Sequence, residues 1–137
     1  MKVKVLPGEL TGSIEAAPSK SAMQRACALA LLAHGTSRIT NAGYSNDDKA
    51  AIGVISALGA KVNELPNNEI EITSNGIENA GNEIYCGESG LGIRMFTPIA
   101  AISDKEIRIT GSGSLTTRPM SFFDELFPQL VIAIHTN

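Results

Sequence analysis

Residues 18–33 read PSKSAMQRACALALLA and set the architecture of the chain. From Ser21 to Ala33 the run is apolar on nearly every side and is followed by Gly35, which predicts a buried helix capped by Ser19 or Ser21. A helix without a polar face must be packed against other elements on all sides. The sequence therefore predicts a mixed α/β (α+β) fold in which sheet covers inner helices.

The chain contains an internal repeat. The segment SRITNAG at residues 37–43 recurs as IRITGSG at residues 107–113. A little over a dozen residues before each copy, an arginine opens an apolar run, namely Arg25 before the first copy and Arg94 before the second. This self-similarity predicts that one unit of helices and strands is built twice.

Periodicity and turn residues predict the elements of each copy. Alternating Val3, Val5 and Ile14 predict strands ahead of the first copy. We then expect, in order, a helix at Ser21–Ala33, a strand at Arg38–Thr40, a helix that begins after Ser45 and ends near Gly59, strands at Lys61–Glu64 and Glu69–Thr73, a helix at Ser89–Ile102, a strand at Glu106–Thr110, a helix begun by Pro119, and a strand at Val131–Ile134.

Three short basic loops open expected helices, at residues 18–25, 87–94 and 116–119. The N-terminus of a helix exposes unpaired N–H groups and a partial positive charge, so acids normally occupy its first turn. Here the charged residues of these loops are mostly cations, namely Lys20, Arg25, Arg94 and Arg118. A bound anion would accept the amides and offset the cations together, so the loops predict a site for phosphorylated or carboxylated small molecules.

Composition narrows the expected partners. The chain has 137 residues, a net charge of −3 and only 4% aromatic residues. Nucleic acids and anionic membrane surfaces need a basic field, so neither is expected as a partner. The start lacks the apolar run of a signal peptide, and the run from Ala26 to Ala33 is too short to span a bilayer, so we expect a cytoplasmic location. Cys27 and Cys86 form no metal-ligand pattern, so no metal is expected.

The order and spacing of several motifs carry a family resemblance. The motifs are Pro-Ser-Lys-Ser-x-x-x-Arg, Ala33-His34-Gly35, the helix start Asn46-Asp47-Asp48, Leu58-Gly59-Ala60, Gly-x-Ser-Gly-x-x-x-Arg and Arg118-Pro119. Together they resemble the N-terminal part of EPSP synthase (3-phosphoshikimate 1-carboxyvinyltransferase), over nearly the whole chain. The resemblance implies two domains, each built of three βαβαββ units whose inner helices point their N-termini into the cleft between the domains.

The resemblance also implies a division of the chain. Residues 1–17 are expected to be leading strands that belong to the second domain, residues 18–80 the first βαβαββ unit, and residues 81–137 a truncated second unit. About two units are then present, without the third unit and without most of the opposite domain. We therefore expect the leading and final strands to lack sheet partners and the chain to self-associate through them.

The activity that the resemblance implies is transfer of the enolpyruvyl group of phosphoenolpyruvate to the 5-hydroxyl of shikimate 3-phosphate. Phosphate is released, and no cofactor takes part. Lys20 is expected to be a catalytic residue that contacts both substrates. The carboxylates that act as acid and base lie in the family's other domain, so this chain alone is expected to be inactive.

The remaining candidate residues bind substrates in this interpretation. Ser21 and Arg25 are expected to hold shikimate 3-phosphate, and Gly90 and Arg118 to contact phosphoenolpyruvate. Arg94 is expected to hold the phosphate of phosphoenolpyruvate or to brace its loop. All of these residues open or precede expected helices, so the resemblance and the helix-start argument lead to the same place in the sequence.

Other interpretations stay open at this point. A related enzyme, UDP-N-acetylglucosamine enolpyruvyl transferase, usually has Ala-Lys-Asn in place of Ser19-Lys20-Ser21 and fits less well. A non-catalytic anion-binding or assembly module built on the same repeat is a second alternative. Arg25 taken alone would form an ordinary ion pair with Asp47 or Asp48.

Residues of the second and third basic loops also have structural interpretations, and the second loop departs from the family pattern. Gly90 and Gly92 are also compatible with a role in turn geometry alone, and Arg118 with simple entry into a helix. The family's common Asn-x-Gly-Thr loop has a carboxylate and an alkyl group here, at Glu88 and Leu91. Both departures lie beside the expected phosphoenolpyruvate site.

Overall fold

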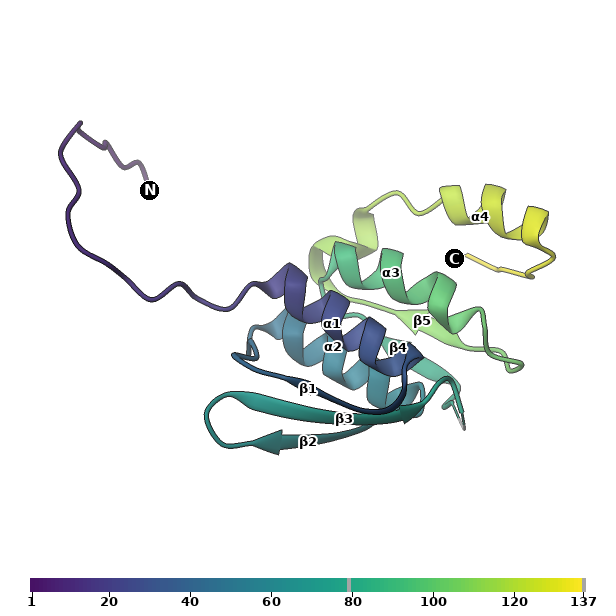
Figure 1. The fold of residues 1–137 in the computed structure, drawn as a ribbon. Coiled ribbons are helices and arrows are strands. Elements are labelled where there is room, and N and C mark those ends of the chain that lie inside the picture. Colours follow the sequence, from purple (N-terminus) through teal and green to yellow (C-terminus); the bar gives the residue numbers. More distant parts are fainter. Residues whose placement is uncertain (79, 137) are drawn as a thin grey trace.

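A computed structural model describes residues 1–78 and 80–136 (Figure 1). Asn79 and Asn137, which fall within the two expected units, lie outside the described residues. The elements in chain order are α1 (Lys20–Leu32), β1 (His34–Ile39), α2 (Asn46–Ala57), β2 (Lys61–Leu65), β3 (Glu69–Asn75), β4 (Glu83–Tyr85), α3 (Gly90–Ala100), β5 (Arg108–Thr110) and α4 (Phe122–Leu126), with the short 3-10 helices η1 (Gly113–Thr117) and η2 (Phe127–Leu130). The predicted mixed α/β class is confirmed.

Serine side chains cap the longer helices. Ser19 Oγ accepts a hydrogen bond from Ala22 N at 3.4 Å ahead of α1, and Ser89 Oγ accepts one from Gly92 N at 2.9 Å ahead of α3. Ser45 opens α2 with a capping box. Because a cap involves only residues within one turn, the local sequence determines these starts, and the predicted starts of the three helices are confirmed to within a residue.

Two small sheets accompany the helices. Strands β1, β3 and β2 form an antiparallel sheet in that order, and β4 pairs with β5 in parallel. The β2–β3 turn contains Asn67 and Asn68 at φ 59° and 55°, a conformation that asparagine tolerates better than most residues. The predicted hairpin is confirmed. β1 begins at His34, earlier than expected, because its whole length pairs with β3.

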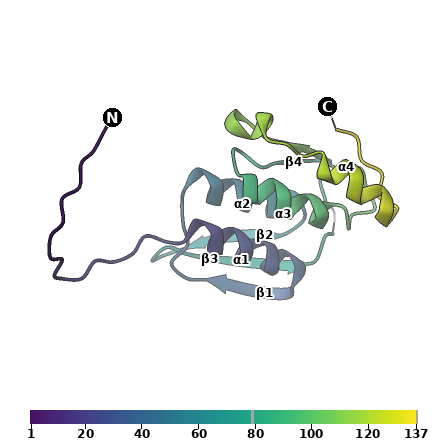
Figure 2. The same cartoon turned by 90° about the horizontal axis from the view of Figure 1, so that it is seen from above.

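The helices pack in layers around one core. α1 and α2 lie side by side on one face of the three-stranded sheet (Figures 1 and 2). α3 packs against both helices on the side of the helix pair that faces away from this sheet. Leu31, Ile55, Ile72 and Phe96 are fully buried where these elements meet. Cover by sheet is therefore confirmed for one side of α1, and α2 and α3 cover further parts of its surface.

One face of α1 is open, which corrects the expectation of burial all round. Leu29 is 70% exposed and Leu32 is 41% exposed, and Arg25 lies on the same face. Apolar periodicity cannot distinguish a face that is buried in this chain from one that has no neighbour here. The open face marks where a further element is able to pack.

The second copy repeats the beginning of the first. α3 and β5 follow one another as expected, with α3 ending at Ala100 rather than Ile102 and β5 beginning at Arg108 rather than Glu106, whereas the short strand β4 ahead of α3 is not among the expected elements. The helix expected from Pro119 starts later, at Phe122, and spans only Phe122–Leu126. Phe123 anchors this helix, since it is buried and its ring centroid lies 5.1 Å from that of Phe127.

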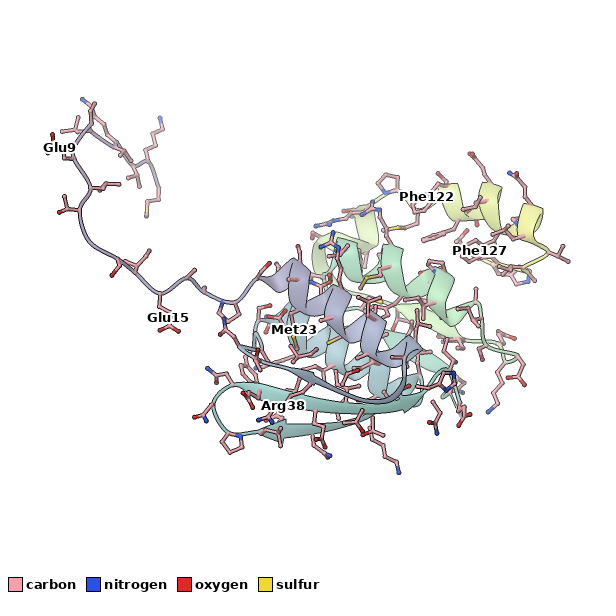
Figure 3. All side chains as sticks on the ribbon, in the orientation of Figure 1. Glu9, Glu15, Met23, Arg38, Phe122 and Phe127 are labelled. Carbon is pink, nitrogen blue, oxygen red and sulfur yellow. The ribbon has the colours of Figure 1, made fainter. Side chains whose placement is uncertain are left out.

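The strands expected at the two ends of the chain are wrong for this structure. Residues 1–19 contain no helix or strand, and Glu9 and Glu15 stand far from the packed elements (Figure 3). Val131–Ile134 also forms no strand. A strand needs a neighbour for its N–H and C=O groups, and neither segment pairs with any described part of the chain. The assignment of residues 1–17 to a second domain stays a prediction.

Candidate functional site

The N-termini of α1, α2 and α3 meet at one end of the molecule, on the left in Figure 1. A salt bridge between Lys20 and Asp47 joins the start of α1 to the start of α2. A hydrogen bond between Gln24 and Ser89 joins α1 to the cap of α3. Each helix start carries a partial positive charge, so the three together form a favourable place for an anion. We call this end of the molecule the helix-start cluster; its candidate residues are Lys20, Ser21, Arg25, Gly90, Arg94 and Arg118.

Lys20 is the first residue of α1. Its Nζ lies 2.8 Å from Asp47 Oδ2, with the lysine side chain 54% exposed. The hydrogen bond to Asp47, followed by the charge of Asp47, raises the pKa of Lys20 above its ordinary value of 10.5. Lys20 is therefore a fixed positive charge at neutral pH, held by a carboxylate while its ammonium group stays open to solvent.

Ser21 and Arg25 lie one turn apart on α1. Arg25 Nη1 donates a hydrogen bond to the carbonyl oxygen of Ser21 at 3.0 Å, which folds the guanidinium back toward the start of the helix. The expected alternative, an ion pair of Arg25 with an acid of α2, is not formed. Asp47 pairs with Lys20, and Asp48 accepts from both the amide and the hydroxyl of Ser45.

Two arginines converge on Gly90 at the start of α3. A Cβ built on Gly90 would overlap Arg118 Nη1 and would lie 3.1 Å from Arg94 Nη1. Arg94 Nη1 also donates to the carbonyl oxygen of Gly90 at 3.2 Å. Neither arginine forms a salt bridge with any residue that the structure describes. Two like charges that meet at a helix N-terminus without a salt bridge to either are the electrostatic pattern of an anion site.

The same geometry tests the alternative roles, in turn geometry or helix entry, of Gly90, Gly92 and Arg118. Gly90 and Gly92 do not have positive φ, so neither is required for turn geometry. Gly90 instead leaves the space that the guanidinium of Arg118 occupies. Arg118 follows directly after η1 and lies four residues before α4, so it does not enter a helix directly.

Sequence reasoning missed the position of the Glu88 carboxylate. The side chain is turned toward η1, where Oε2 accepts a hydrogen bond from Ser114 N at 3.2 Å. The carboxylate covers Gly113, whose φ is 54° and whose missing side chain leaves room for it. Ser114 Oγ in turn accepts from Arg118 Nη2 at 3.2 Å. The carboxylate therefore holds the turn that carries Arg118, while Leu91 is half-buried.

Sequence reasoning also missed the contact between α1 and α3. Gln24 and Ser89 are 1% and 3% exposed and face one another at the centre of the cluster. The available signal was the single amide side chain of Gln24 within an apolar run. Its partner, 65 residues away, leaves no mark in the sequence pattern.

A groove of about 870 Å³ runs beside the cluster, between α2 and the loops that precede α3 and η1. Lys20, Asp47, Lys49, Glu83 and Glu88 contribute its charged groups. Arg25, Gly90, Arg94 and Arg118 do not line it. The structure thus brings the candidate residues to one end of the molecule but does not enclose all of them in one pocket.

The described residues also bear on metal sites, reactive thiols and membrane spans. They contain no group of three or more His, Cys, Asp or Glu side chains arranged to hold a metal ion. Burial raises the pKa of Cys27 and of Cys86 to about 12, so both thiols stay protonated at neutral pH. No helix within residues 1–78 and 80–136 is long and apolar enough to cross a membrane.

The fold is a mixed α/β arrangement in which the starts of three helices meet at one end of the molecule. The chain superposes on an EPSP synthase structure from Acinetobacter baumannii with a TM-score of 0.76 at 23% identity, over 87% of this chain and 28% of that one. A sequence model described as EPSP synthase (3-phosphoshikimate 1-carboxyvinyltransferase) matches residues 6–136. The chain belongs to the EPSP synthase family.

Curated relatives agree with this membership. A 3-phosphoshikimate 1-carboxyvinyltransferase of Clostridium beijerinckii is 36% identical over 135 residues, which cover 93% of this chain and 31% of that protein. One from Methanobrevibacter smithii is 39% identical over 132 residues, which cover 95% of this chain and 30% of that protein. The chain therefore spans slightly less than one third of the length of these relatives.

Proposed function

We propose that this chain forms one side of the substrate cleft of an EPSP synthase. The observation that carries the proposal is the convergence of Arg94 and Arg118 on Gly90 at the N-terminus of α3. Both guanidinium groups are exposed, and the helix-start amides beside them favour negative charge. This combination suits the phosphate or the carboxylate of phosphoenolpyruvate.

The proposed reaction moves an enolpyruvyl group in two steps. In the first, the 5-hydroxyl oxygen of shikimate 3-phosphate bonds to C2 of phosphoenolpyruvate, while the hydroxyl loses a proton and the methylene carbon gains one. In the second, the bond between C2 and the phosphate oxygen breaks as the new methyl group loses a proton. The double bond is restored, and inorganic phosphate leaves. Negative charge grows on the departing phosphate, where nearby cations stabilise it.

The helix-start cluster supplies charge and hydrogen-bond donors to this reaction. Gly90, Arg94 and Arg118 bind phosphoenolpyruvate in the proposal, and Ser21 and Arg25 hold the phosphate of shikimate 3-phosphate. Lys20 lies where α1 meets α2 and contacts both substrates as the catalytic residue of the set. Because its ammonium group is protonated, it acts by charge and not as a base.

The acid and the base of the proposal come from outside the cluster. Asp47 is paired with Lys20, and Asp48 caps α2, so neither is free to exchange a proton with a substrate. We therefore expect no turnover from residues 1–137 alone. Phosphate release from shikimate 3-phosphate and phosphoenolpyruvate above an enzyme-free control would contradict this expectation.

Calorimetry of the chain with shikimate 3-phosphate at low salt tests the binding half of the proposal. We expect weak, saturable binding, because an anion on an open surface stays largely solvated and screened. Arg25→Gln should abolish the heat, whereas Arg108→Gln, which removes the same charge from β5, should retain it. No heat from the unsubstituted chain at millimolar ligand would contradict the proposal. Equal affinity for inorganic phosphate and shikimate 3-phosphate would favour a non-catalytic anion-binding module instead.

A further inference from the structure

Gln24 and Ser89 form a buried hydrogen bond at a place where the packing of the core does not require polar side chains. Ser89 Oγ donates to Gln24 Oε1 at 2.8 Å, and the two residues are 1% and 3% exposed. Apolar residues of similar size would fill the same space without burying polar atoms, and such replacements often leave stability unchanged or improved. A buried polar pair adds something that an apolar pair lacks, namely one defined arrangement of the two helices.

Both partners of the bond are held in place. Ser89 Oγ also accepts from Gly92 N at 2.9 Å, so the cap of α3 fixes the hydroxyl. A Cβ on Gly92 would lie 3.0 Å from Ser89 Oγ and 3.6 Å from Gln24 Oε1, so the glycine gives the contact its room. Gln24 lies within the buried face of α1 and accepts the Ser89 hydrogen bond there.

The bond joins the two halves of the helix-start cluster. Gln24 is followed in sequence by Arg25, which belongs to the α1 half together with Lys20 and Ser21. Ser89 is followed by Gly90, on which Arg94 and Arg118 converge. A sliding movement between α1 and α3 would change the distance between the halves, and the Gln24–Ser89 bond opposes that movement.

We propose that Gln24 and Ser89 are positioning residues that set the spacing between the two anion-binding halves of the cluster. This inference rests on the proposed function, because it assigns one substrate to each half. With the bond in place, shikimate 3-phosphate on α1 and phosphoenolpyruvate on α3 lie at the spacing that lets them bind together. Without it, each half still binds an anion, but the two ligands no longer fit together.

Gln24→Met is the main test variant, because it keeps the length of the side chain and leaves the Ser89 cap on Gly92 intact. Ser89→Ala and the double variant complete a mutant cycle. Thr97→Val is the matched control, since Thr97 is also buried in α3 and its hydroxyl donates within the helix, to Ile93 O at 2.6 Å. It removes a buried hydrogen bond without touching the link between α1 and α3.

Three titrations are followed by NMR on each variant: inorganic phosphate alone, shikimate 3-phosphate alone, and phosphoenolpyruvate in the presence of shikimate 3-phosphate. For Gln24→Met we expect the single-ligand affinities to change less than about twofold, and the affinity for the second ligand to fall about tenfold. The double variant should be no worse than Ser89→Ala, which already lacks both the bond and the cap, and Thr97→Val should match the unsubstituted chain.

The outcomes separate this inference from the function on which it rests. If the unsubstituted chain binds none of the ligands, both are overturned. If it binds them and Gln24→Met leaves the second-ligand affinity unchanged, only the positioning role is overturned. If all three affinities fall together, in Gln24→Met and Thr97→Val alike and in proportion to lost thermal stability, the bond is merely structural and the inference is again wrong.

Discussion

Lys20 Nζ and Asp47 Oδ2 lie 2.8 Å apart, so a carboxylate of the chain itself occupies one side of the cation assigned to the substrates. Asp47 is only 19% exposed in its side chain, and it belongs to the first turn of α2, where the helix dipole also favours its charge. An incoming phosphate must share Lys20 with this carboxylate or displace it. Under the proposed function, the Lys20–Asp47 pair therefore weakens anion binding.

We expect Asp47→Asn to tighten binding of shikimate 3-phosphate by a few fold at low salt, and less as salt screens the charges. The pKa of Lys20 should fall toward its ordinary value, because Asp47 raises it through a hydrogen bond and through charge. A raised pKa stabilises the fold below the unfolded value of 10.5, and this contribution is lost as the pH rises through the folded value. NMR titration of the lysine side chain measures both effects.

Asp104→Asn is the control for this prediction, because it removes an equal charge beyond the C-terminal end of α3, away from the cluster. If Asp47→Asn and Asp104→Asn change the affinity equally, the effect is one of net charge alone. The proposed competition at Lys20 would then be wrong.

Gly90→Ala should weaken phosphoenolpyruvate binding about tenfold with little loss of stability. The backbone at Gly90 is helical, so alanine is tolerated there, but its Cβ would displace the guanidinium of Arg118. Gly53→Ala on α2 is the matched substitution, since its Cβ would meet nothing within 4 Å, and it should stabilise the chain by about 0.5–1 kcal/mol. Thermal unfolding and ligand titration of both variants decide the matter. Unchanged affinity in Gly90→Ala would show that Arg118 does not bind at this place.

The thiols of Cys27 and Cys86 should resist alkylation by iodoacetamide in the native chain at pH 8 and react readily in denaturant. Burial raises the pKa of each to about 12, so the thiolate is rare at that pH. Because the folded pKa is the higher one, the resulting stabilisation is present below about pH 9 and is lost as the pH rises toward 12. Mass spectrometry counts the modified thiols. Rapid labelling of the native protein would contradict the burial of these residues.

Self-association is expected at micromolar concentration. The exposed apolar side chains of Val3, Val5 and Leu29 have no partner among the described residues, and β1 leaves one edge of its sheet unpaired. Leu29→Lys should weaken the association, whereas Lys105→Gln, a change at an exposed residue of the loop between α3 and β5, should not. Analytical ultracentrifugation measures the effect. A strictly monomeric species would rule out the expected assembly.

The parts of this fold that the sequence predicts are those controlled within one turn or one hairpin. Ser19, Ser45 and Ser89 cap their helices by local contacts, and the β2–β3 hairpin follows from its asparagine turn. Strands at the two ends of the chain could not be judged in this way, because a strand forms only against a neighbour and these segments have none among the described residues.

In the candidate site, too, the sequence predicts the features that depend on local residues and misses those that depend on distant ones. Cations at helix starts are visible in the sequence because the rule they break is local. The convergence of Arg118 on Gly90, the direction of Glu88 and the Gln24–Ser89 bond all join residues far apart in the chain. The order of the motifs identifies these segments, but only the packed structure shows which of their atoms are in contact.

NMR titration of the chain with phosphoenolpyruvate, read at the side-chain Nε–H signals of Arg94 and Arg118, tests the central claim most directly. We predict saturable shifts of both signals at low salt, loss of binding in Arg118→Gln, and retention of binding in Arg108→Gln, which removes the same charge from β5. Equal responses of Arg118→Gln and Arg108→Gln, or shifts spread evenly over exposed arginines including Arg38, would mean that the helix-start cluster is not an anion site and would contradict the account.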